Sequence, residues 1–127
     1  MYCPEPAPTY WLYVLCRRDA SAVKIGMTRN WPSRTFAFVH PYRAVADVFD
    51  LDSSRAFLVG PSKIEVLRRE GEIKRFFANW RVDARSREWF DGAVTGDVLA
   101  LAGSFDDDND QVMLTLRDAL EIQSVQG

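Results

Sequence analysis

The sequence predicts a mixed α+β fold in which an antiparallel sheet is flanked by helices. Two strand-like runs, residues 10–16 and 22–28, are rich in aromatic and β-branched residues and lie close enough to form a hairpin. A third run, residues 44–51, also fits a strand, and an apolar stripe with helical spacing follows between residues 73 and 80. Apolar residues make up 47% of the 127-residue chain, which is enough for one packed core.

The predicted hairpin sets the two faces of the sheet. Pairing of Cys16 with Val23 across a polar turn places Tyr13 and Lys24 on one face, with Gly26 opposite the tyrosine. The other face of the hairpin is uniformly apolar and is expected to meet the core. Gly26 is expected to leave space next to Tyr13 because it has no side chain.

Later segments carry signals for helices. Ser62 and Glu65 have the spacing of a capping box, which predicts that a helix begins there. Thr95 is expected to cap a helix over residues 96–103, and a last helix is expected over residues 111–123.

The chain divides into three parts by composition and charge. Residues 1–9 are expected to form an extended, proline-rich leader, residues 10–90 the main domain, and residues 91–127 an acidic helical extension packed on that domain. Residues 1–90 carry 15 lysines and arginines against 10 acidic residues, whereas residues 91–127 carry one arginine against 8 acidic residues. The net charge of −2 therefore hides a basic front part that can attract phosphates.

The sequence contains no evident targeting or membrane segment. Its longest apolar run, residues 10–16, is far shorter than the ~20 residues that a bilayer crossing needs. Cys3 and Cys16 lack the spacing of metal ligands, and a buried free thiol is expected for Cys16. We therefore expect a cytoplasmic protein without a membrane partner.

Four side chains of the basic part form a candidate phosphodiesterase site: Tyr13, Lys24, Arg34 and Glu72. The carboxylate of Glu72 is a ligand type that Mg²⁺ and Mn²⁺ prefer. Arg34, on a short helix that Asn30 is expected to cap, offers a planar fork of donors to phosphate oxygens. Either Tyr13 or Lys24 can activate water if neighbouring charges shift its pKa, and the sequence leaves both roles open.

The order of these residues resembles the GIY-YIG endonuclease superfamily, and most closely its phage-associated branch with a Lys-Ile-Gly second motif. Tyr13 lies where the tyrosine of the first motif belongs, with Trp11 in place of its glycine. Residues 24–26 read Lys-Ile-Gly and match the second motif. Arg34 matches the family arginine, and Glu72 matches the helix glutamate.

The resemblance extends over residues 10–90 and implies both a fold and a cofactor. Residues 88–90 read Glu-Trp-Phe, as the end of the domain often does in that branch, and Arg75 stands where a histidine is frequent. The resemblance implies three central antiparallel strands with helices packed around them. It also implies a single Mg²⁺ or Mn²⁺ ion held by Glu72.

The expected function is metal-dependent hydrolysis of DNA phosphodiester bonds by a GIY-YIG-type endonuclease. Positive side chains expected to contact the nucleic-acid backbone are Lys63, Arg68, Arg69, Lys74, Arg75, Arg81, Arg85 and Arg87. The alternative is a catalytically inactive module of the same fold that binds nucleic acid or a partner protein. In that interpretation Tyr13 is a core aromatic, and Glu72 forms an ordinary helix ion pair with Arg68 or Arg75.

Overall fold

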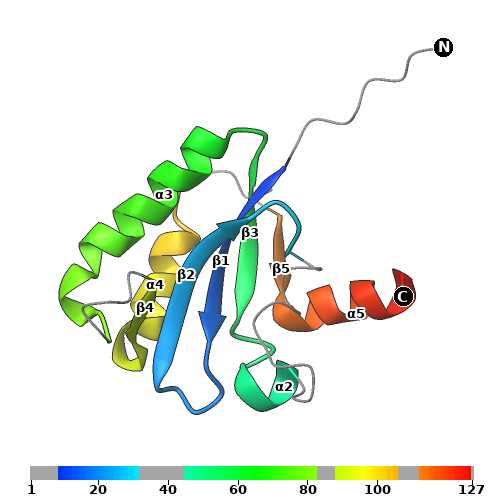
Figure 1. The fold of residues 1–127 in the computed structure, drawn as a ribbon, viewed down its shortest axis with the longest axis horizontal. Helices are drawn as coiled ribbons and strands as arrows, with labels where there is room; N and C mark the ends of the chain where they lie inside the picture. Colours follow the sequence, from blue (N-terminus) through cyan, green and yellow to red (C-terminus); the bar gives the residue numbers. More distant parts are fainter. Residues whose placement is uncertain (1–8, 32–44, 83–87, 106–111, 127) are drawn as a thin grey trace.

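The computed structural model describes residues 9–31, 45–82, 88–105 and 112–126 (Figure 1). Its centre is an antiparallel sheet of five strands in the order β4-β2-β1-β3-β5. The strands are β1 (Tyr10–Cys16), β2 (Ala22–Thr28), β3 (Arg55–Gly60), β4 (Trp89–Asp91) and β5 (Met113–Thr115). The α-helices are α2 (Val45–Val48), α3 (Lys63–Phe76), α4 (Thr95–Ala102) and α5 (Leu116–Gln126). Two short 3₁₀ helices are η2 (Ala78–Trp80) and η3 (Gly92–Val94). The predicted α+β class is confirmed.

The β1–β2 hairpin has the predicted register. Cys16 lies opposite Val23, and Tyr13 lies opposite Gly26. The Cys16 thiol is free and buried as predicted, and burial raises its pKa to about 11, so it is a poor nucleophile near neutral pH.

Helices cover both faces of the sheet, with α3 and α4 on one side and α2 and α5 on the other (Figure 1). The face expected to meet the core packs against α3 and α4. The buried cluster between them includes Leu12, Val14 and Ile25 of the sheet and Val66, Ile73 and Val98 of the helices. The opposite face is also covered, by a second buried cluster that includes Tyr13, Leu15, Trp31, Phe49, Leu116 and Ala119. The face that carries Tyr13 is therefore less open than the sequence alone indicated.

The third strand was predicted in the wrong place. Residues 45–48 form α2, and Phe49 pairs with Arg17 in an isolated bridge and is not part of a strand. The side chain of Asp50 accepts hydrogen bonds from the backbone N–H groups of Asp52 and Ser53, which makes a turn before β3 begins. The strand that pairs with β1 is therefore β3, after this turn.

The C-terminal part also differs from the prediction at its start. The expected helix over residues 111–123 begins only at Leu116, because β5 precedes it and pairs with β3. The N–H of Thr115 donates to Asp118 at 3.0 Å, and the N–H of Asp118 donates to the Thr115 hydroxyl at 3.1 Å. These two reciprocal hydrogen bonds form the same pattern as a capping box, and they determine where α5 begins.

The start of α3 is confirmed, since the N–H of Glu65 donates to the Ser62 hydroxyl at 3.1 Å. The expected cap of α4 is wrong, because Thr95 is the first residue of the helix and its hydroxyl donates to the Gly92 carbonyl. In the part of the chain that the structure describes, no helix combines the length and apolar character needed to cross a bilayer.

Candidate active site

The β1–β2 hairpin holds Tyr13 directly over Gly26. A Cβ atom at position 26 would lie 2.3 Å from the Tyr13 hydroxyl oxygen and 2.4 Å from its Cζ atom. The Tyr13 ring also stacks on Trp31, with ring centroids 5.7 Å apart, and only 2% of Tyr13 is exposed. Tyr13 is therefore fixed from both sides, and the position opposite it requires a glycine.

Lys24 shares this face and contacts the Glu-Trp-Phe segment. Its Nζ atom lies 3.4 Å from an oxygen of Glu88 and 5.9 Å from the ring centroid of Trp89, its partner across β2 and β4. The Lys24 side chain is only 13% exposed, so the contact with Glu88 is partly shielded from water. The sequence pointed to Glu88 only as part of a terminal motif. Its contact with Lys24 depends on the pairing of two segments far apart in the chain.

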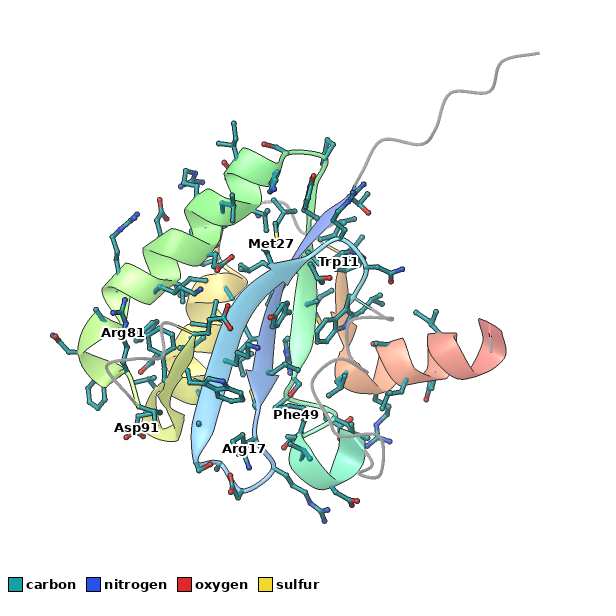
Figure 2. The ribbon with its side chains drawn as sticks, in the orientation of Figure 1. Trp11, Arg17, Met27, Phe49, Arg81 and Asp91 are labelled. Carbon is teal, nitrogen blue, oxygen red and sulfur yellow. The ribbon has the colours of Figure 1, made fainter. Side chains whose placement is uncertain are left out.

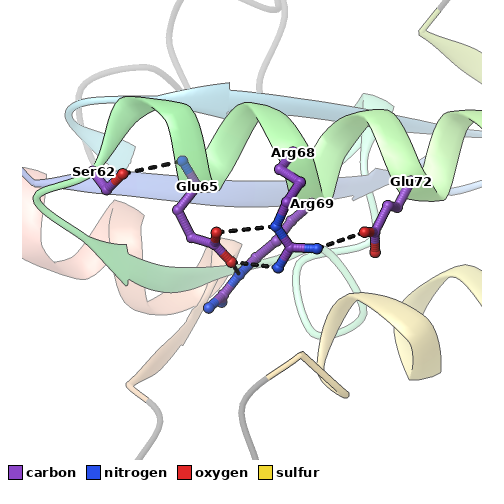
Figure 3. A network of polar contacts seen from close by, with 5 residues as sticks. All are labelled: Ser62, Glu65, Arg68, Arg69 and Glu72. Atoms are coloured by element: carbon purple, nitrogen blue, oxygen red, sulfur yellow. Dashed lines mark hydrogen bonds and ion pairs between the residues drawn. The ribbon is translucent and has the colours of Figure 1, made fainter.

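Glu72 belongs to a network on α3 (Figure 3). The guanidinium of Arg68 lies between Glu65 and Glu72 and donates to both carboxylates. Arg69 donates to Glu65 at 3.0 Å. The ion pair considered for Glu72 is thus present, with Arg68 as the partner.

The structure places Tyr13 and Glu72 on opposite sides of the sheet. Val66 and Ile73 of α3 pack in the cluster that contains Leu12, whereas Tyr13 belongs to the cluster on the other face. Glu72 also lines a hollow with Leu101 of α4. Among the described residues, Tyr13, Lys24 and Gly26 are brought together, and Glu72 is not among them. Arg34 lies outside the described residues.

A second carboxylate on α3, Glu70, was not singled out from the sequence. Its side chain is 15% exposed, and one oxygen accepts from Lys74. The other oxygen is buried and has no hydrogen-bond partner within the described ranges. Four residues after Val66 and three before Ile73, Glu70 lies beside the buried helix stripe, and this spacing is the signal that could have revealed it.

Glu70 and Glu72 point in nearly opposite directions. Residues two apart on an α-helix are separated by about 200° around its axis. Glu72 faces α4, so Glu70 lies on the flank of α3 away from α4. Because α3 contacts β2 and β1 while α4 contacts β1, that flank faces the β2 side of the sheet.

The predicted nucleic-acid contacts fall into two groups. Arg68, Arg69 and Lys74 are engaged by glutamates of their own helix. Lys63, Arg75 and Arg81 form no ion pair with any other described residue, and both arginines are exposed. Arg85 and Arg87 lie outside the described residues. The positive charge available to a ligand is therefore smaller than the sequence count indicates.

The Glu65 network predicts a dependence of stability on pH. Hydrogen bonds from Arg68, and then from Arg69, lower the pKa of Glu65 to about 2. The unfolded pKa is about 4.3, so this contribution is complete above that pH and is lost as pH falls towards 2. In urea unfolding, the midpoint of the wild type should fall more steeply between about pH 5 and pH 2 than that of Glu65→Gln. Equal slopes for the two proteins would contradict this assignment.

The comparisons with known proteins identify a family for the chain. Residues 10–100 match the T5orf172 domain, a phage-associated domain related to GIY-YIG/HNH-like endonucleases. No curated protein and no solved structure matches the chain significantly. Because the match spans well over half of the 127 residues, the chain belongs to the T5orf172 domain family.

Proposed function

We propose that this chain is a metal-dependent nuclease of the GIY-YIG type that hydrolyses phosphodiester bonds in DNA. The observation that carries the proposal is the hairpin geometry, in which Tyr13 is held over Gly26 and Lys24 shares its face. The relation of the T5orf172 domain to endonucleases supports the same reaction class. The buried free thiol of Cys16 fits a reducing compartment, and we propose the cytoplasm.

Each residue of the site has a distinct role in this proposal. The Tyr13 hydroxyl positions the attacking water or takes its proton. Lys24, held beside Glu88, supplies positive charge near the reacting phosphate. Arg34 binds the phosphate oxygens through its planar fork and stabilises charge that develops on them.

A single Mg²⁺ or Mn²⁺ ion would be held by one carboxylate of α3. The described residues contain no group of three or more histidine, cysteine, aspartate or glutamate side chains that could hold a metal. In this proposal one carboxylate would hold the ion, water and phosphate oxygens would complete its ligand set, and the ion would neutralise phosphate charge. Glu72 is the ligand expected from the sequence, but it is bonded to Arg68.

Glu70 is the better metal ligand in our proposal. A buried carboxylate oxygen without a hydrogen-bond partner is costly, and a bound cation would offset that cost. Glu70 lies on the β2 side of α3, so it can meet a phosphate held on the Tyr13 face only around the edge of β2. The pairing of β2 with β4 ends at Lys24, and the N–H of Ile25 still donates to the Glu88 carbonyl at 3.0 Å. Beyond Ile25, no described strand pairs with β2 at that edge.

DNA cleavage with and without metal tests the proposal. Purified protein should cleave DNA in the presence of Mg²⁺ or Mn²⁺ and stop when EDTA is added. Arg34→Ala should lower the rate by about 10²-fold or more, since it removes a donor to charge that develops in the transition state. DNA binding, measured by fluorescence anisotropy, separates lost chemistry from lost affinity. Absence of cleavage with both metals would contradict the nuclease proposal.

The second candidate is a module of the same fold that binds nucleic acid, or a partner protein, without cutting. Two observations favour it. Glu65, Glu70 and Glu72 of α3 are each paired with a cation of the same helix, and Tyr13 is almost fully buried. This candidate predicts salt-sensitive DNA binding that persists without metal and produces no cleaved product.

A further inference from the structure

The end of α3 and the following η2 helix expose aromatic side chains that the core does not use. Phe76 is 73% exposed and Trp80 is 49% exposed, whereas the neighbouring Phe77 is buried in the core. Val82, two residues after Trp80, is exposed as well. Single exposed apolar residues are common, but three of them within seven residues make a local apolar surface.

Phe76 lines two hollows between α3 and α4. The larger has a volume of about 540 Å³ and the smaller about 420 Å³, within the range of ~300–1,000 Å³ typical of small-ligand pockets. The larger hollow is lined by Phe76, Phe77, Asp97, Ala100, Leu101 and Ser104. The smaller is lined by Glu72, Arg75, Phe76 and Leu101.

Arginines flank these aromatic side chains along the chain, and polar residues of α4 and the loop after it line the larger hollow. Arg75 precedes Phe76, and Arg81 follows Trp80; neither arginine forms an ion pair with another described residue. On the side of α4, Asp97 and Ser104 line the larger hollow, and both side chains carry oxygens that can accept hydrogen bonds. The surface thus offers cations at its margin and acceptors inside the hollow.

We propose that this surface, which we call the aromatic end of α3 and define as Arg75, Phe76, Trp80 and Arg81, binds unpaired bases of single-stranded DNA. The inference rests on the nucleic-acid substrate of the proposed function and names its strand class. Unpaired bases stack on exposed aromatic rings, and arginines beside the rings contact the phosphates. Asp97 and Ser104, which line the larger hollow, can accept hydrogen bonds from the amino groups on base edges.

A duplex fits this surface poorly. Its bases are stacked on each other and cannot cover Phe76 or Trp80. In the part of the chain that the structure describes, this surface has two arginines without an ion pair, Arg75 and Arg81. They provide few phosphate contacts for a double helix, because Arg68, Arg69 and Lys74 are already paired within α3. The aromatic rings therefore favour an unpaired strand over a paired one.

The aromatic end of α3 leads towards the candidate active site. Arg81 forms an isolated bridge with Phe90, and the N–H of Val82 donates to the Trp89 carbonyl at 3.2 Å. Arg81 accordingly lies on the same side of the molecule as Asp91 of β4 (Figure 2). Trp89 is the cross-strand partner of Lys24, so this segment connects the aromatic surface with Lys24.

Fluorescence anisotropy with two DNA probes tests the inference in buffer that contains EDTA. The probes are a labelled single-stranded oligodeoxynucleotide of mixed sequence and the duplex that it forms with its complement. The wild type should bind the single strand more tightly than the duplex. Phe76→Ala and Trp80→Ala should each weaken single-strand binding by about tenfold and leave duplex binding unchanged. Ile64→Ala, at an exposed position near the other end of α3, is the matched control and should bind like the wild type.

The outcomes separate this inference from the nuclease proposal, because binding in EDTA does not require cleavage. Single-strand binding that depends on both aromatic residues supports the inference even if no metal restores cleavage. Single-strand binding unaffected by either substitution overturns it, even if the protein cuts duplex DNA. Equal loss of single-strand binding in Ile64→Ala also overturns it. Circular dichroism verifies that each variant is folded.

Discussion

Gly26→Ala is expected to destabilise the domain by about 1–3 kcal/mol and to lower DNA cleavage by about 10²-fold. The added methyl group would lie 2.3 Å from the Tyr13 hydroxyl oxygen, well inside van der Waals contact. Tyr13 cannot simply swing away, because it is buried and stacked on Trp31. Either the tyrosine or the β1–β2 pairing must shift, and both displace the hydroxyl from its position.

Gly96→Ala provides the matched control. Gly96 lies within α4, and a Cβ atom there meets no atom within 4 Å. Alanine should therefore stabilise the helix by up to about 1 kcal/mol without changing cleavage. Urea unfolding and cleavage assays on both variants check the pair. A Gly26→Ala protein with wild-type stability and rate would show that Tyr13 is not confined as described.

Glu70→Gln is expected to lower metal-dependent cleavage by about 10³-fold, because it removes the charge of the proposed metal ligand. The amide keeps the size of the side chain and an oxygen that can accept from Lys74, so the fold should persist. Glu72→Gln removes the same charge two residues away, on the flank that faces α4. Its cleavage rate should stay close to that of the wild type.

The comparison of these two variants decides which α3 carboxylate is used. Cleavage rates are measured at several Mg²⁺ concentrations, so that weaker metal binding is distinguished from a slower chemical step. Lost activity in Glu72→Gln with normal activity in Glu70→Gln would restore Glu72 as the ligand. Normal activity in both would remove α3 from the metal site.

The hairpin and the start of α3 were predictable because local sequence determines them. The short polar turn after β1 and the alternation of Val23, Ile25 and Met27 with polar or small residues in β2 favour a pairing that keeps Tyr13 and Lys24 on one face, and the structure has the expected register. The Ser62–Glu65 spacing likewise specified the helix cap, because the Ser62 hydroxyl accepts from the N–H of Glu65.

Features that depend on distant contacts were not predictable in the same way. Residues 45–48 have strand-like composition but form α2, because β3 takes the place next to β1. The contact of Lys24 with Glu88 requires β4 to pair with β2 across more than sixty positions of sequence. Helix geometry predicts that Glu70 and Glu72 point in opposite directions, but the sequence does not specify that α4 lies on the Glu72 side of α3.

The single-turnover cleavage rate of Tyr13→Phe in Mg²⁺ tests the central claim most directly. Phenylalanine keeps the ring that stacks on Trp31 and removes only the hydroxyl group over Gly26. The account predicts a rate lower by about 10²–10⁴-fold, the usual contribution of a positioned acid or base, with unchanged DNA affinity. A Tyr13→Phe protein that cleaves as fast as the wild type would contradict it.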